Sequence, residues 1–316
     1  MKHDTKGQEK QNKQLDSVYP IFARHETFHP RFGWLKKGFD KAQSDPEVFI
    51  KDNASVVLGV GKNMVRSIRY WCSAFKVLGE NQSNAKRGRV SVPSEFVMNL
   101  LSDAGWDPYL ENPGSLWLLH WYMLKPPCRA ATWFFVFNQF RQLEFTTDDL
   151  LMNLEEYKKQ TFPSDRTVRA SLNKDINCLI RMYAQQRNYK SPSEDSIDCP
   201  FAELGLILNH ENSRRYFFSI GTKPSLPDEI IVAACLDYAS FYEEGTRTVS
   251  ISRLLYDVNS PGLAFKLTEN GLCSAIENIA LKIDGISLSN NAGLIQLSYN
   301  QPPKSLVKLI LEMFYR

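Results

Sequence analysis

Residues 59–78 read GVGKNMVRSIRYWCSAFKVL, and this stretch decides the fold class. At about 100° per residue, its side chains separate onto two faces of a helix. The apolar face consists of Met64, Val65, Ile68, Trp71, Cys72 and Phe75. The opposite face consists of Lys62, Arg66, Arg69, Ser73 and Lys76. Because the apolar face must pack on a core, the spacing predicts a helix over residues 62–76 whose cations face solvent.

Basic charge is concentrated around this helix. Residues 62–89 hold seven basic residues and one acidic residue, whereas the whole chain has a formal net charge of +3. Such an uneven distribution indicates one surface for an anionic partner. Asn63 stands at the start of the helix, where an amide can pair with adenine. A basic hairpin with Lys86, Arg87 and Arg89 would grip a neighbouring groove. We therefore predict that this face binds DNA; the alternative is a solvated basic surface.

Turn-rich stretches divide the 316 residues into a flexible tail (1–18) and three units (19–113, 114–198 and 199–316). Each unit contains a helix, a short second helix and an amphipathic third helix, and hairpins follow in the first and third. This is the order of a winged helix, so we expect a mainly α fold with small β hairpins, built from tandem winged-helix-like units. The alternative is a mainly helical α+β fold without that repeat.

The expected elements follow from periodicity and end signals. Helices are predicted over 29–40, 46–58, 62–76, 116–124, 130–140, 147–160, 165–183, 227–242, 250–256 and 268–283, and a hairpin over 286–299.

The later amphipathic helices differ in charge. The helix over 165–183 carries a weaker polar face with the predicted DNA contacts Arg166 and Arg169. The helix over 268–283 exposes Glu269 and Glu277, which would repel phosphate, so a structural or protein-binding role is expected there. Aromatic residues of the second unit favour a core over a partner groove: Trp117, Trp121, Trp133, Phe134, Phe135 and Phe137.

Residues 22–34, FARHETFHPRFGW, hold the densest mixture of reactive and aromatic side chains. His25, Glu26 and His29 match the pattern H-E-x-x-H, which binds zinc only when it lies on a helix. Pro30 disfavours helical backbone at His29. The first interpretation is therefore that both histidines are structural. If the chain cuts DNA, His25 is the expected general base, with Glu26 and His29 orienting it or holding a metal. Arg31 is a further candidate DNA contact.

Several classes are excluded by the sequence. Apolar runs are too short for a membrane helix and the first residues are polar, so a cytoplasmic protein with no membrane association is expected. Six cysteines without a CxxC pair predict reduced core thiols and no zinc site. Residues 59–62, Gly-Val-Gly-Lys, lack the rest of a P-loop, and no compact nuclease motif is present.

Two stretches together resemble a known family: FARHETFHPRFGWLKKGFDKA (22–42) and VVLGVGKNMVRSIRYWCSAFKVL (56–78). They are similar to the SspB-like DNA-nicking subunits of bacterial single-strand DNA phosphorothioation defence systems, a family long catalogued as a domain of unknown function. The resemblance covers the first quarter most strongly.

The resemblance implies a protein that nicks or opens DNA so that sulfur can replace a phosphate oxygen of the backbone. It implies a cysteine desulfurase and ATP-dependent sulfur-transfer proteins as partners. No cofactor follows from the residues themselves, although nicking would call for a divalent metal such as Mg²⁺. The alternative function is a non-catalytic winged-helix adaptor or transcription regulator.

Overall fold

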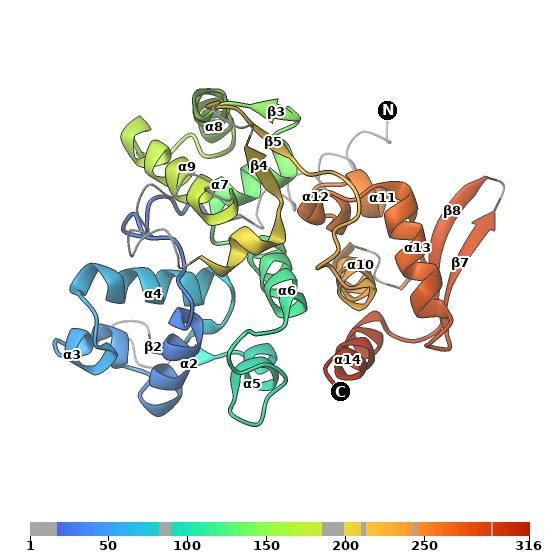
Figure 1. Cartoon of the computed structure of the whole chain (residues 1–316), viewed down its shortest axis with the longest axis horizontal. Helices are drawn as coiled ribbons and strands as arrows, with labels where there is room; N and C mark the ends of the chain where they lie inside the picture. Colours follow the sequence, from blue (N-terminus) through green and yellow to red (C-terminus); the bar gives the residue numbers. More distant parts are fainter. Residues whose placement is uncertain (1–17, 82–89, 185–198, 210–212, 243–244, 292) are drawn as a thin grey trace.

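The computed structural model describes residues 18–81, 90–184, 199–209, 213–242, 245–291 and 293–316. The described chain is mainly helical with small antiparallel sheets, which confirms that part of the predicted fold class (Figure 1). The predicted flexible tail lies outside the described residues apart from Val18, which is buried and bridges to Cys128.

The first unit has the expected order of helices and hairpin. Its elements are α2 (Trp34–Ser44), a 3₁₀ turn (Val48–Ile50), α3 (Ala54–Leu58), α4 (Lys62–Ala74), β1 (Leu78–Asn81), β2 (Val90–Pro93) and α5 (Glu95–Leu101). The predicted helix 29–40 in fact begins at Trp34, because Gly33 takes the left-handed conformation with φ 74° just before it. The predicted helix 46–58 is divided by a turn at residues 51–53.

The second group of elements begins with α6 and ends in a three-stranded sheet. It contains α6 (Pro113–Leu124), α7 (Ala131–Phe134), a π-helical turn (Phe135–Gln139), β3 (Glu144–Phe145), α8 (Thr147–Thr161), α9 (Arg169–Tyr183), η3 (Pro200–Leu204), β4 (Ile207–Asn209) and β5 (Tyr216–Phe218). Helix α9 begins four residues later than predicted, because the Asp165 carboxylate accepts the Thr167 N–H in a turn. The sheet order is β3-β5-β4, so the sheet spans the expected boundary at residue 198.

The third group of elements resembles the second in its order of helices and strands. It contains α10 (Asp228–Tyr242), β6 (Thr248–Ser250), α11 (Ile251–Tyr256), α12 (Pro261–Phe265), α13 (Glu269–Ala280), β7 (Ile286–Asn291), β8 (Leu294–Tyr299) and α14 (Pro303–Phe314). The sheet order is β6-β8-β7, and the predicted hairpin is confirmed with Ile286 opposite Tyr299. Helix α14, which the sequence analysis did not predict, packs against α10.

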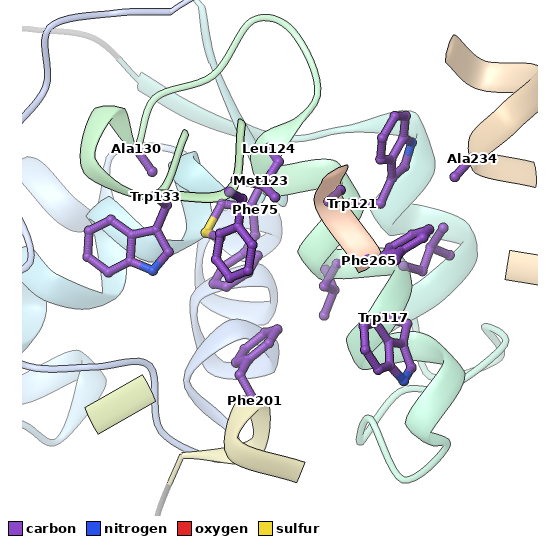
Figure 2. Close-up of a cluster of buried hydrophobic side chains, with 14 of the residues drawn as sticks. Phe75, Trp117, Trp121, Met123, Leu124, Ala130, Trp133, Phe201, Ala234 and Phe265 are labelled. Carbon is purple, nitrogen blue, oxygen red and sulfur yellow. The ribbon is translucent and has the colours of Figure 1, made fainter. Parts of the chain in front are cut away.

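One continuous core runs through all three groups, and α6 lies within it. Trp117 and Trp121 on α6 pack against Phe265 from α12, at ring centroid distances of 5.7 and 6.1 Å (Figure 2). Phe75, just beyond α4, stacks on Phe201 of η3 at 4.8 Å (Figure 2). The six aromatic side chains that were expected to lie in the core of the second unit are all buried: Trp117, Trp121, Trp133, Phe134, Phe135 and Phe137.

His120 is one of the polar residues buried in this core. It is fully buried on α6, where one ring nitrogen lies 2.7 Å from the Tyr183 hydroxyl and the other 2.9 Å from the Ala264 carbonyl. Burial lowers the pKa of His120 to about 3. The imidazole is therefore neutral in the folded protein at neutral pH.

This depressed pKa predicts acid sensitivity. Between pH 6.5 and 3 the unfolded chain binds a proton at residue 120 that the folded chain does not, so the free energy of unfolding falls as the pH falls. At about 1.4 kcal/mol per pH unit, the loss from this histidine is about 2 kcal/mol at pH 5. Urea unfolding of wild type and His120→Asn at pH 7 and pH 5 measures it. The stability gap between the two proteins should shrink toward pH 5; a gap independent of pH would contradict the assignment.

Candidate nucleic-acid interface

The segment before α2 forms a compact loop, which we call the N-terminal loop (residues 22–33). Ala23, Glu26 and Thr27 all have positive φ, at 53°, 50° and 68°. The H-E-x-x-H residues therefore do not lie on a helix, and their two histidines do not have the one-face spacing of a zinc protease.

A buried carboxylate on α9 fixes this loop. Asp175 Oδ1 accepts hydrogen bonds from the Ala23 N–H at 2.9 Å and from His25 Nε2 at 2.7 Å. Its Oδ2 accepts from the Thr132 hydroxyl at 2.7 Å. Both His25 and Asp175 are buried, with 0% and 1% of their side chains exposed. His25 thus holds the loop against α9 and is not presented at the surface.

Aromatic rings close over the same histidine. The His25 ring stacks on Trp71 of α4 at 6.2 Å and meets the edge of Trp133 of α7 at 5.9 Å. Trp71 Nε1 donates a hydrogen bond to the Phe28 carbonyl at 3.0 Å. On the other side, Arg181 of α9 donates to the Thr27 carbonyl at 2.9 Å. The N-terminal loop therefore joins α4 to α9 (Figure 1).

Helix α4 presents the start of its predicted basic face to solvent. Lys62, Asn63 and Arg66 are exposed, whereas Arg69 is half-buried. The Arg66 side chain is 67% exposed, and its guanidinium lies 3.8 Å from the Glu26 carboxylate of the N-terminal loop. The apolar face packs inward as predicted, with Val65, Ile68, Trp71 and Cys72 all buried.

Lys76 does not belong to this surface, which corrects the prediction. Helix α4 ends at Ala74, and Lys76 takes a positive φ of 57° that turns its side chain inward. Its ammonium donates to the carbonyls of Tyr122 and Lys125. Burial lowers the pKa of Lys76 to about 7. The side chain thus connects α4 to the end of α6 and has no free ammonium for a phosphate.

Helix α9 exposes a second polar face beside the N-terminal loop. Its exposed side chains are Arg169, Asn173, Lys174, Asn177 and Arg181, and Arg166 is exposed just before the helix. Arg169 forms an ion pair with Glu155 of α8. Lys174, Arg181 and the exposed Arg24 of the loop were not among the predicted contacts. The four-residue spacing from Arg169 through Asn173 and Asn177 to Arg181 was a signal that could have found one of them.

Of the remaining predicted site residues, two lie in the N-terminal loop and three in the predicted wing. His29 is buried. Arg31 lies over the rings of Phe28 and Trp34, at 5.8 and 5.6 Å from the ring centroids. Lys86, Arg87 and Arg89, the predicted wing residues, lie outside the described residues.

Within the described part of the chain, no three His, Cys, Asp or Glu side chains gather in a way that could hold a metal ion. The six cysteines are free thiols, as predicted. Among the helices described, none is long and apolar enough to cross a membrane.

Comparison with known proteins places the chain in a family. A family described as a protein of unknown function (DUF4007) matches residues 22–315. The chain belongs to this DUF4007 family. Two solved structures, described as an SspB crystal structure and a magnesium ion-bound SspB crystal structure, are each 37% identical to it. Each match covers 96% of this chain and 90% of the other, with a TM-score of 0.88. A search of curated proteins finds no match.

The geometry around Asp175 predicts that this member of the DUF4007 family depends on that carboxylate for stability. Asp175→Ala leaves His25, Thr132 and the Ala23 N–H without their acceptor in a buried site, at a cost of about 3–5 kcal/mol. The matched variant Thr132→Val removes one of these bonds and should cost about 2 kcal/mol. Urea unfolding measures both. An Asp175→Ala variant no less stable than Thr132→Val would show that the carboxylate does not organise the loop.

Proposed function

We propose that α4, α9 and the N-terminal loop between them form a DNA-binding face. The observation that carries the proposal is the gathering of exposed cations from three segments onto one surface. Arg66 of α4 and Arg181 of α9 contact adjacent loop residues, Glu26 and Thr27, so the two helices present their polar faces on either side of the same loop. Lys62 and Lys174 extend the surface along each helix.

We further propose that the chain consists of tandem winged-helix-like units. The third group supports this with a helix, a strand, three further helices and two strands in that order, and with a sheet in which the first strand pairs with the last, β6-β8-β7. The second group repeats that sheet pattern as β3-β5-β4. In this arrangement α4 and α9 are the last α-helices before the closing strands of their units, the position of a recognition helix that enters the major groove. Glu269 and Glu277 on α13 argue for a structural or protein-binding third unit.

The biological role that we propose is DNA binding within a phosphorothioation-based modification and defence system. The 37% identity to SspB over 96% of the chain supports it, together with the family resemblance of residues 22–42 and 56–78. The expected partners are a cysteine desulfurase and ATP-dependent sulfur-transfer proteins.

Salt dependence tests the DNA-binding face. If four to six cations neutralise phosphates, log affinity should fall with log salt with a slope of about −4 to −5. The double variant Lys62→Ala/Arg66→Ala should bind more weakly and reduce the magnitude of the slope by about 2. Binding to a labelled duplex at several salt concentrations measures both.

A matched control removes the same charge elsewhere. Lys304 and Lys308 are exposed on α14, which is separated from α4 by α5 and α6 in the view of Figure 1. The double variant Lys304→Ala/Lys308→Ala should keep the wild-type slope. Equal loss in both double variants would show that net charge, and not this face, binds DNA.

Strand nicking is a finer proposal that rests on Glu26. Of the three candidate catalytic residues, His25 and His29 are buried, whereas the Glu26 side chain is 34% exposed beside Arg66. Mg²⁺ is commonly bound through one or two carboxylates plus substrate phosphates, and one similar structure is described as magnesium ion-bound. Glu26 is therefore the residue that would hold such an ion at this face.

A supercoiled-plasmid assay with and without Mg²⁺ separates the two functions. A nickase converts supercoiled plasmid to the relaxed form, and Glu26→Gln should slow this at least about tenfold while leaving binding in place, a loss of about 1.4 kcal/mol in transition-state stabilisation. Unchanged supercoiled plasmid across protein and Mg²⁺ titrations would instead favour the non-catalytic adaptor or regulator, which the burial of His25 also favours.

A further inference from the structure

A cavity of about 360 Å³ lies between the second and third groups of elements. None of its lining residues belongs to the proposed DNA-binding surface of α4, α9 and the N-terminal loop, which we call the α4/α9 face. Its walls come from the loop after the π-helical turn, from β5, and from α11, α12 and the start of α13. This volume falls within the range of small-ligand pockets, about 300–1,000 Å³. The lining includes two cations and three aromatic side chains: Arg141, Lys266, Phe140, Phe218 and Tyr256.

Lys266 is a buried cation without a carboxylate partner among the described residues. Its ammonium donates to the Phe137 carbonyl at 2.9 Å and lies 4.3 Å from the centroid of the Phe218 ring. The nearby cation Lys223 donates to the Lys266 carbonyl at 3.1 Å. Burial, with the charges of Arg141 and Lys223, lowers the pKa of Lys266 to about 7. A lysine held in this way is stabilised when an anion enters the cavity.

Arg141 adds a second cation to the same lining. Its side chain is exposed, and within the described chain it has neither a hydrogen bond nor an ion pair with another residue. The acidic residue among the described lining is Glu269, which is exposed on the first turn of α13. The positive charge of the cavity is therefore not balanced by a buried acid.

Aromatic rings provide the rest of the recognition surface. Phe140 and Phe218 are buried in the wall, whereas Tyr256 is 65% exposed at the lining. Aromatic side chains stack on nucleobases without requiring a particular base, and arginine binds phosphate through paired N–H donors.

We propose that this cavity binds a nucleoside monophosphate group, with the phosphate near Arg141 and Lys266 and the base against the aromatic wall. The group is either a free nucleotide or a nucleotide turned out of a DNA strand. Enzymes and binding proteins that act on DNA often extrude one nucleotide into such a pocket. The inference is independent of the α4/α9 face, because the two surfaces share no residue.

Calorimetric titration of the full-length protein with dAMP tests the inference. The wild type should bind dAMP at least tenfold more tightly than either inorganic phosphate or deoxyadenosine, because each lacks half of the recognised chemistry. Arg141→Ala, at an exposed position, should weaken dAMP binding about tenfold or more, a change of about 1.4 kcal/mol. The control Lys304→Ala should bind as the wild type does.

A competition arm distinguishes the two sources of the group. A short single-stranded oligonucleotide that displaces dAMP from both the wild type and the Lys62→Ala/Arg66→Ala variant indicates a nucleotide within a strand; failure to displace it indicates a free nucleotide. Lys266→Met, checked for folding by circular dichroism, should repeat the Arg141→Ala loss. Absence of dAMP binding, equal affinity for dAMP and inorganic phosphate, or unchanged binding in Arg141→Ala would overturn the inference, whatever the DNA titrations of the α4/α9 face show.

Discussion

Helix α6 has no polar face, and the rest of the fold is arranged to surround it. A helix that is apolar all round must be buried on every side, and from Gly114 to Trp121 its side chains are all buried. Elements from three parts of the chain cover it: η3, α10 and α12. The η3 turn also packs on α9, and its Phe201 stacks on Phe75 at the end of α4. The spatial relation of α4 to α9 therefore follows from the need to enclose α6.

The buried carboxylate of Asp175 is a second constraint on the fold, and it is a polar one. Burying a carboxylate costs several kcal/mol unless donors surround it. Here the donors come from the N-terminal loop and from α7, in the form of His25, the Ala23 N–H and Thr132. The cost of burial thus becomes a geometric constraint, because the carboxylate is satisfied only when the loop lies against α9. Within the H-E-x-x-H residues, His25 binds Asp175, whereas Glu26 points outward and lies beside Arg66.

The sequence predicted those features that repeat locally. The two faces of α4 follow from a period of 3.6 and the hairpin near Ile286 from a period of 2, whereas the buried aromatic residues around Trp117 follow from a run that is apolar throughout. Strands β3 to β5 are two or three residues long, and β3 pairs with β5 from Glu144 to Phe217, far apart in the sequence, so local periodicity does not reveal them.

The candidate site was predicted less completely, for reasons that particular residues show. The N-terminal loop depends on positive φ at Ala23, Glu26 and Thr27, which side chains of these types do not indicate. Lys76 fits the helical spacing of the basic residues in the sequence. In the structure α4 ends two residues earlier, and the Lys76 ammonium donates hydrogen bonds to backbone carbonyls inside the protein. Arg24 and Arg181 lie on the proposed DNA-binding face only because the N-terminal loop packs against α9. This is a tertiary contact, which local sequence patterns do not predict.

On the α4/α9 face, which we propose binds DNA, acidic neighbours would lower the affinity for phosphate without abolishing it. Arg66 lies near Glu26, and Arg169 pairs with Glu155. Exposed ion pairs of this kind contribute about 0–1 kcal/mol each, so a phosphate can replace the carboxylate at little cost. Lys62 and Lys174 have no acidic partner among the described residues and would attract a phosphate directly. If this face binds DNA as we propose, the neighbouring carboxylates hold the guanidinium groups in position beforehand, so that part of the ordering entropy of binding is already lost in the free protein.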